Sequence, residues 1–175
     1  DPVLKRMRRW HTREQYRRRV LEIADRIWPL GLGADVITGF PGETPTDHEA
    51  TSSLIRELPF TYLHVFPFSP RDRTVAARLP SPVPQRIAGE RSRELREMAN
   101  DKGLAYKASR IGGPAEVIVE GESGTALTGD YIRVGLVGLD RESKGLSSPR
   151  YSGTLQGDKE HLYIELSQDP AAILE

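Results

Sequence analysis

The chain has 175 residues, with 25 Lys and Arg against 25 Asp and Glu, and it contains no cysteine. This length accommodates one or two domains, and the lack of cysteine excludes disulfides, thiolate metal sites and iron-sulfur ligation by these residues. There is no apolar run long enough for a transmembrane helix and no signal-peptide pattern, so we expect a cytoplasmic protein with no membrane partner.

The N-terminal residues are strongly basic although the whole chain is neutral. Residues 1–19 contain eight Lys or Arg side chains and only two acidic ones, Asp1 and Glu14. Such a basic end can bind phosphate or nucleic acid, whereas the plainer alternative is a solvated helix face, and the pattern leaves both open. Because the chain begins at Asp1 rather than Met, we expect a fragment or a processed piece.

The first helix is predicted from a capping box, Thr12-Arg-Glu-Gln15, which favours a start at Arg13. Apolar side chains recur at helical spacing up to Ile27 and predict one buried face. Pro29 and Gly31 then end the helix.

A buried strand is predicted over residues 33–38, followed by a glycine-proline turn. Gly39 and Gly42 allow positive φ or a close backbone approach. Thr46-Asp-His-Glu49 reads as a second capping box, for a helix from Asp47 to Leu58. Ligands of α/β proteins sit at the carboxyl ends of strands, so this turn is a candidate cofactor site. Many such junctions carry Gly and Pro without a ligand, so that alternative stays open.

The next strand is predicted over residues 62–66, and helices alternating with strands indicate parallel α/β construction. Two strands alone do not make a covered parallel sheet, so the domain should be incomplete. Residues 67–84 are rich in Pro, Ser and Arg and are predicted to form a functional loop. A long charged helix is expected from Pro84 to Lys107.

Gly112-Gly-Pro114 marks the expected domain boundary. Beyond it, strands are predicted at residues 115–120, 131–134 and 161–166, and their short length with glycine turns favours a small β-barrel. Such barrels bind RNA through exposed aromatic and basic side chains, for which Tyr131, Arg133 and Tyr151 are candidates. The alternative is that the tyrosines pack the barrel, which is the expectation for Tyr163.

Three stretches together resemble the radical SAM tRNA methylthiotransferases. They are Val3-Leu-Lys-Arg-Met7 with Arg9 and Thr12, Asp35-Val-Ile-Thr-Gly-Phe-Pro-Gly-Glu-Thr44, and Leu63-His-Val-Phe-Pro-Phe-Ser-Pro-Arg71. The resemblance covers nearly the whole chain in order. His64-Val-Phe-Pro67 is most similar to the branch that acts on threonylcarbamoyladenosine at position 37 of tRNA. The branches that act on isopentenyladenosine and on a ribosomal-protein aspartate look less similar.

The resemblance implies an α/β fold class. Residues 1–111 would be the C-terminal part of a partial (β/α) radical SAM barrel with its closing helices. Residues 112–168 would be a small all-β barrel called TRAM, and residues 169–175 a tail. The implied enzyme adds a methylthio group to C2 of N6-threonylcarbamoyladenosine by radical SAM chemistry. Its partners would be S-adenosyl-L-methionine and the anticodon stem-loop of tRNA, and the chain is expected to be a monomer.

The family also implies two 4Fe-4S clusters, whose cysteine ligands lie upstream of the matching region. This chain would therefore be inactive alone, and we expect no catalytic residue and no metal ligand within it. The implied cofactor-binding residues are Ile37, Gly39, Phe40, Glu43, Phe66 and Arg9. The implied RNA-binding residues are Lys5, Arg8, Arg71, Tyr131, Arg133 and Arg150.

Some of these roles stay open. Lys5 and Arg9 could reach the cofactor carboxylate or a tRNA phosphate, since charge-assisted bonds suit either. Gly39 is implied because a side chain there would collide with the cofactor. The chain departs from the family at Arg8, where Asn is usual, at Trp10-His11, where Arg and Tyr are common, and at Asp72-Arg73, which replaces Pro-Gly.

Two alternative functions are considered from the sequence. Residues 113–168 could be a stand-alone RNA-binding module without catalytic activity. An unrelated hydrolase-like fragment could use Asp35, Asp47 or His64, but no serine or cysteine nucleophile sits in an elbow. His48 and Glu49 are better explained by helix capping than by metal binding.

Overall fold

The computed structural model describes residues 1–120, 124–137 and 150–166. The chain divides into two compact units, Asp1–Lys102 and Gly103–Glu175. The domain boundary expected at residues 112–114 stays a prediction, and the tail expected at residues 169–175 lies outside the described residues. Within the described ranges, no helix has the length and apolar character needed to cross a membrane.

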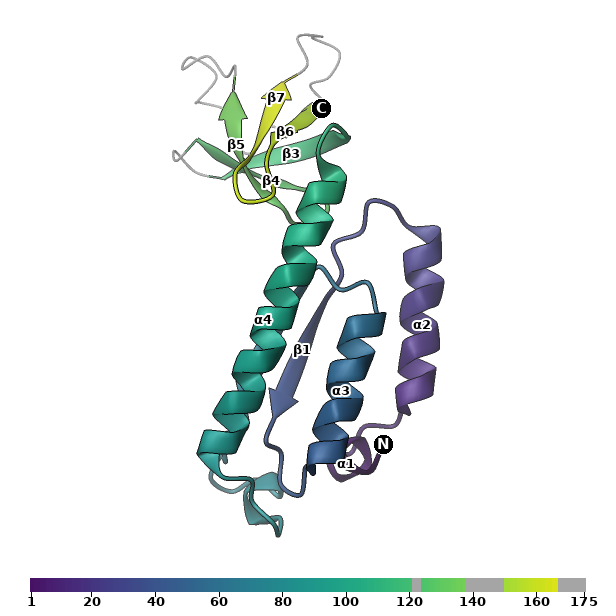
Figure 1. The fold of residues 1–175 in the computed structure, drawn as a ribbon, viewed down its shortest axis with the longest axis vertical. Coiled ribbons are helices and arrows are strands. Elements are labelled where there is room, and N and C mark those ends of the chain that lie inside the picture. The colour runs from purple at the N-terminus through teal and green to yellow at the C-terminus, as the bar shows by residue number, and fades with distance from the viewer. Residues whose placement is uncertain (121–123, 138–149, 167–175) are drawn as a thin grey trace. The chain divides into compact units, whose positions relative to one another are not determined.

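The first unit alternates helices with strands, as predicted. Both strands pair in parallel, in a register that runs from Gly33 opposite Tyr62 to Thr38 opposite Pro67. The elements are α1 (Pro2–Arg6), α2 (Arg13–Arg26), β1 (Gly33–Thr38), α3 (Pro45–Glu57), β2 (Tyr62–Pro67), the short 3-10 helix η1 (Ala76–Arg78) and the long α4 (Gln85–Arg110) (Figure 1).

Helices α2, α3 and α4 contribute to one hydrophobic core with the sheet. Val20 of α2, Ile55 of α3 and Leu95 of α4 belong to a single buried cluster with Val65 of β2. Side chains alternate across a strand, so the other face of the sheet is left open to solvent. The described part of the first unit contains this two-stranded sheet, and the larger radical SAM barrel remains a proposal.

The helix starts show one confirmed prediction and one correction. Thr12 and Gln15 form the expected reciprocal capping box at the start of α2. The box predicted at Thr46 is wrong, because Thr44 caps α3. The Thr44 hydroxyl accepts a bond from the Asp47 amide, and the Asp47 carboxylate accepts one from the Thr44 amide. Pro45 explains the difference: proline suits the first helical position, and the residue before it is driven into the extended conformation that a cap requires.

The second unit contains a closed barrel, as predicted, in the order β3-β4-β5-β7-β6. Strands β5 and β7 pair in parallel, and the remaining neighbours pair antiparallel. The strands are β3 (Pro114–Glu120), β4 (Thr125–Thr128), β5 (Arg133–Val137), β6 (Arg150–Gly157) and β7 (Leu162–Leu166).

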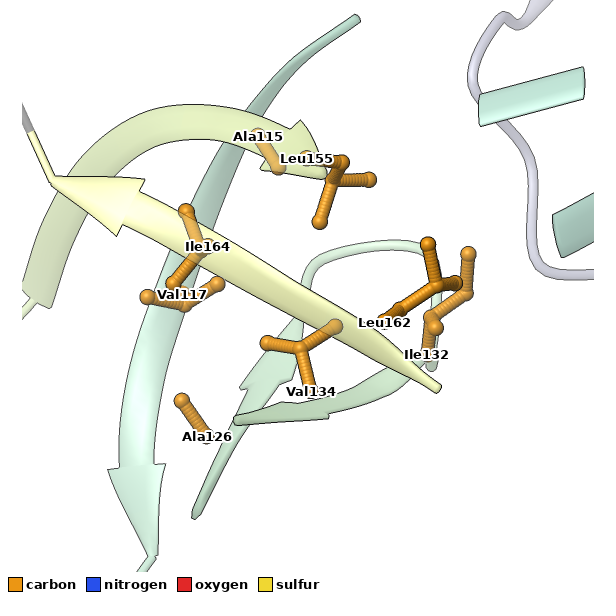
Figure 2. Close-up of a cluster of buried hydrophobic side chains, with 8 residues drawn as sticks. All are labelled: Ala115, Val117, Ala126, Ile132, Val134, Leu155, Leu162 and Ile164. Atoms are coloured by element: carbon orange, nitrogen blue, oxygen red, sulfur yellow. The ribbon is translucent and has the colours of Figure 1, made fainter. Parts of the chain in front are cut away.

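Small and branched apolar side chains fill the barrel. Figure 2 shows them converging from the strands and from the turn before β5, and the core consists of Ala115, Val117, Ala126, Ile132, Val134, Leu155, Leu162 and Ile164. The expectation that Tyr163 packs inside is wrong. Leu162 and Ile164 point inward, so the period of two places Tyr163 between them on the outer face, where it is 38% exposed.

The strand predicted at 131–134 begins later than expected. Tyr131 has a φ of +63° and lies in the turn before β5. The preceding residue, Asp130, accepts hydrogen bonds on its carboxylate from Arg110 Nε and from the Tyr106 hydroxyl, both at 2.7 Å. This buried cluster fixes the last turns of α4 to the barrel within the second unit.

Candidate functional site at the strand ends

The turn after β1 is closed by its own hydrogen bonds. Gly39 and Gly42 have φ values of +73° and +78°, as the sequence predicts for a tight turn. The Gly39 amide donates to Glu43 Oε2 at 2.6 Å, and the Gly42 amide donates to the Ser81 carbonyl at 2.7 Å. The Glu43 amide donates to the Phe40 carbonyl at 2.9 Å. These three amides are occupied within the chain and do not form an anion-binding loop.

Glu43 is buried, and its carboxylate is held by the chain itself. Besides the Gly39 amide, Glu43 Oε2 accepts a bond from Arg91 Nη1 of α4 at 2.6 Å. The same Arg91 nitrogen also donates to the Glu43 carbonyl at 3.2 Å. Phe40 is buried too, with its ring edge-on to Phe68 at 5.2 Å between centroids. Glu43 and Phe40, which are both predicted to bind the cofactor, are therefore buried in the turn and stabilise its shape.

Gly39 has a reason within the fold to be glycine. A Cβ at this position would lie 2.3 Å from the Cβ of Ala88 on α4, in addition to the strain of its positive φ. The neighbouring Thr38 hydroxyl bonds to the Ala88 carbonyl at 3.0 Å and to Ser92 at 2.6 Å. The close approach of α4 to the strand end is therefore a reason within the fold for this glycine, and the cofactor collision that the resemblance implies stays a prediction.

Two other predicted residues meet on the open face of the sheet. Ile37 and Phe66 are register partners and are 40% and 52% exposed. On β2 the rings of Tyr62, His64 and Phe66 follow one another, with centroids 5.6 Å and 6.5 Å apart. We call this set, with Asp35 opposite His64, the open sheet face. Its apolar part at the carboxyl ends of the two parallel strands consists of Ile37 and Phe66.

The Tyr62 ring covers the start of β1. A Cβ on Gly33 would lie 2.0 Å from two carbon atoms of that ring, so only glycine allows the ring to lie flat there. Tyr62 is not assigned to a site from the sequence, and His64 is named there only for the hydrolase-like alternative. The signal was present in the alternation of β2, because every second residue from Tyr62 is aromatic or imidazole.

The basic N-terminal segment is hydrogen-bonded to the turn after β1, residues 39–43, which we call the strand-end turn. Arg6, which was not among the predicted site residues, donates from Nη2 to the Gly42 carbonyl at 2.6 Å. Lys5, Arg8 and Arg9 are exposed nearby in the chain. Arg8 has a φ of +55° and so turns the chain sharply after α1. The predicted cofactor or phosphate role of Lys5 and Arg9 is compatible with this exposure and stays a prediction.

The remaining predicted RNA-binding residues belong to both units. Arg71 is exposed in the loop after β2, where its carbonyl accepts bonds from the Thr74 amide and hydroxyl. In the second unit Tyr131 is 67% exposed, Arg150 is exposed at the start of β6, and Arg133 forms an ion pair with Glu120 at 3.1 Å.

Metal ligands are not grouped in the part of the chain that the structure describes. Across residues 1–120, 124–137 and 150–166, no cluster of three or more His, Cys, Asp or Glu side chains could hold a metal ion. Ligation of an iron-sulfur cluster by thiolates requires cysteine, which this sequence lacks. The described residues therefore do not fit an iron-sulfur cluster, whereas the exposed apolar surfaces of Ile37 and Phe66 are compatible with an adenine ring.

No family model matches the chain. A tRNA-2-methylthio-N(6)-dimethylallyladenosine synthase of Sorangium cellulosum is 41% identical over 121 residues, which is 69% of this chain and 24% of that protein. The protein of the same name from Desulfitobacterium hafniense is 39% identical over 123 residues, 70% of this chain and 28% of that protein. The threonylcarbamoyladenosine tRNA methylthiotransferase MtaB of Treponema pallidum is 37% identical over 137 residues, 78% of this chain and 28% of that protein.

The chain thus spans about a quarter of the length of these curated relatives. The similarity extends over more than two thirds of the chain itself and recurs in relatives named for two different modified adenosines. Over most of its length, this chain is a homologue of the tRNA methylthiotransferases.

Proposed function

We propose that the chain is part of a radical SAM tRNA methylthiotransferase that modifies C2 of an N6-substituted adenosine at position 37. The observation that carries this proposal is the homology over most of the chain to tRNA methylthiotransferases. The exposed apolar surfaces of Ile37 and Phe66 at the strand ends support it, because ligands of α/β folds bind at that edge. The chain would supply cofactor and substrate walls within a longer protein.

The open sheet face would hold the adenosyl group of S-adenosylmethionine. Ile37 and Phe66 would contact the adenine ring through their exposed apolar surfaces, while Gly39, Phe40 and Glu43 hold the strand end in shape. When bound, S-adenosylmethionine supplies the radical and the methyl group for the reaction. The clusters that activate it need ligands from outside this chain, since it has no cysteine.

The second unit would bind the anticodon stem-loop. Its fold is a small closed barrel, a form used for single-stranded and looped nucleic acid. Tyr131 would stack on a base, and Arg133 and Arg150 would contact phosphates, together with Lys5, Arg8 and Arg71 in the first unit. Phosphate contacts release counterions, so the affinity should fall steeply as salt increases.

We propose threonylcarbamoyladenosine as the modified base, on the strength of His64-Val-Phe-Pro67 and of the similarity to MtaB. The competing base is dimethylallyladenosine, for which the Sorangium and Desulfitobacterium relatives are named. The proposed protein would act as a monomer in the cytoplasm.

A chimera tests the proposal with this chain in place. The chain would replace the homologous segment of the Treponema enzyme, and the chimera would be expressed in cells that lack their own methylthiotransferases. Mass spectrometry of digested tRNA should then detect the methylthio derivative of threonylcarbamoyladenosine. The dimethylallyladenosine derivative alone would correct the base but keep the reaction. A folded, cluster-containing chimera that forms neither product would contradict the proposal.

The second candidate is an RNA-binding module without catalysis, favoured by the compactness of Gly103–Glu175 as a separate unit. Ile37→Asp in the chimera separates the two functions. A charge on the open sheet face should abolish methylthiolation and leave stem-loop affinity unchanged if the first candidate is right. The RNA-binding candidate expects the unsubstituted chimera to bind the stem-loop without modifying it.

A further inference from the structure

Trp10 lies almost completely in solvent, which is unusual for the largest apolar side chain. It is 98% exposed, so its indole contributes almost no buried area to the fold. Indoles normally bury most of their surface in a core or an interface, where they contribute strongly to the binding energy. Within this chain, the Trp10 indole is therefore available to contact a partner.

Hydrogen bonds tie the segments on both sides of Trp10 to other parts of the first unit. On the N-terminal side, Arg6 binds the Gly42 carbonyl of the strand-end turn at 2.6 Å. On the C-terminal side, Thr12 caps α2, and the Arg13 amide donates to Asp1 Oδ1 at 2.7 Å. Trp10 is consequently held in a short bend between two fixed points, rather than at a free chain end.

The exposed side chains at Trp10 and just before it suit a ligand that combines negative charge with an aromatic ring. Arg8 and Arg9 precede it and are exposed. Its neighbour His11 is already used within the chain, with its ring 5.7 Å from that of Tyr16. Asp1, one of the two acidic side chains in this segment, bonds to the Arg13 amide. The exposed groups are thus one indole flanked by guanidinium groups.

We propose that Trp10 stacks on an unpaired nucleobase of RNA while Arg8 and Arg9 bind the phosphates beside it. Every base presents a π-face, so stacking on an indole tolerates any sequence, and guanidinium groups bind phosphate through paired hydrogen bonds. This inference rests on the proposed tRNA function and adds a stacking residue to it.

The test uses the full chain and an unmodified anticodon stem-loop RNA as the probe. The chain contains two tryptophans, so Trp28→Phe leaves Trp10 as the only indole. Stem-loop RNA should quench the fluorescence of Trp10 in this variant. Trp10→Ala should weaken the affinity by about tenfold, the loss typical of one base stack. Trp10→Phe should retain most of the affinity because it keeps a ring.

Salt dependence distinguishes the stack from the phosphate contacts. Trp10→Ala should leave the slope of log affinity against log salt unchanged, since stacking releases no counterions. Arg8→Ala and Arg9→Ala should each flatten that slope by about one. Because Trp10 buries almost nothing, Trp10→Ala should have the same circular dichroism spectrum and thermal midpoint as the native chain.

The outcomes separate this inference from the proposed function. If the chain binds the stem-loop but Trp10 is not quenched and Trp10→Ala binds equally well, the stacking role is wrong and the tRNA function stands. A concentration-dependent blue shift of Trp10 without RNA would show that another copy covers it, and would also overturn the inference. If the chain does not bind stem-loop RNA at low salt, the stacking inference and the proposed RNA-binding role of this chain are both wrong, and the chimera still tests the methylthiolation separately.

Discussion

The Glu43 carboxylate and the Arg91 guanidinium form a buried ion pair 2.6 Å long. Their side chains are 5% and 10% exposed, and the Gly39 amide provides a further bond to the carboxylate. Arg91 belongs to α4, so the pair joins the strand-end turn to a helix 48 positions further along the chain. The geometry of the candidate cofactor turn therefore depends on a residue far away in the sequence.

Removing one partner of this pair should be strongly destabilising. Arg91→Ala leaves a buried carboxylate without its counter-charge, which typically costs about 3–5 kcal/mol of the free energy of unfolding. Urea denaturation of the chain, followed by a probe in the first unit, measures this loss. Hydrogen exchange at the Gly39 amide should also accelerate, because Glu43 loses the partner that orients it.

A surface ion pair provides the matched control. Arg56 and Glu49 are 3.1 Å apart, but their side chains are 52% and 64% exposed. Exposed pairs contribute about 0–1 kcal/mol, so Arg56→Ala should change the free energy of unfolding by no more than that. Equal losses for Arg56→Ala and Arg91→Ala would show that burial does not set the strength of the Glu43 pair.

The two glycines at positions 39 and 89 should respond to alanine with opposite signs. Gly39→Ala combines a positive φ with a Cβ 2.3 Å from that of Ala88, and backbone strain and overpacking each cost about 1–3 kcal/mol. Gly89 lies in α4, where a Cβ would meet nothing within 4 Å, so Gly89→Ala should stabilise by up to about 1 kcal/mol. Thermal denaturation of both variants measures the difference.

A third variant tests the reason given for Gly39. Ala88→Gly removes the atom that the new Cβ would strike, so Ala88→Gly combined with Gly39→Ala should recover the steric part of the loss. The positive φ remains, so recovery should be incomplete. An additive double variant, with no recovery, would contradict the close contact between α4 and the strand end.

Local patterns in the sequence predicted the elements of the first unit well. The Thr12 capping box and the β-branched run at 33–38 act through neighbouring residues, and both were confirmed. The Thr46 capping box failed because two threonines compete and Pro45 decides between them. The Glu43 pair could not be predicted, since nothing near Glu43 in the sequence indicates that Arg91 of a distant helix will neutralise it.

In the barrel, too, local patterns predicted some strands, and others depend on distant residues. Strands β3 and β7 have clear alternation and were predicted, whereas β4 and β6 were missed. β6 has the sequence Arg-Tyr-Ser-Gly-Thr-Leu-Gln-Gly, in which Leu155 is the buried residue. A polar, glycine-containing segment is driven to form a strand by pairing with β3 and β7, which is a tertiary effect. Tyr163 was misplaced because aromatic content outweighed the period of two.

The Asp130 cluster should make the second unit sensitive to acid. Burial raises the pKa of Asp130, but hydrogen bonds from Arg110, Tyr106 and Thr128 outweigh it, and the pKa lies below the ordinary 3.8. The folded state therefore binds a proton less readily than the unfolded state. The resulting stability is fully present above pH 3.8 and is lost as the pH falls through the lowered value.

Asp130→Asn checks this dependence. The variant should be less stable than the native chain at pH 7, and the difference should shrink below pH 3.8, where the native carboxylate also becomes protonated. Urea denaturation at several pH values, followed by circular dichroism of the barrel, measures the difference. Tyr106→Phe, which removes one hydrogen bond of 2.7 Å, should cost about 1 kcal/mol at pH 7. A stability difference that does not vary with pH would contradict the role of the Asp130 charge.

The ion pair between Arg133 and Glu120 predicts that one substitution on the barrel should increase RNA affinity. Both side chains are exposed, 69% and 39%, with 3.1 Å between their charged atoms, so Glu120 competes with phosphate for the guanidinium. Glu120→Gln should therefore strengthen stem-loop binding by a few-fold, whereas Arg133→Ala should weaken it. The control is Glu116→Gln on the same strand β3, which removes the same charge. If both glutamine variants strengthen binding equally, the effect comes from the general charge of the barrel, and Arg133 has no special contact with RNA.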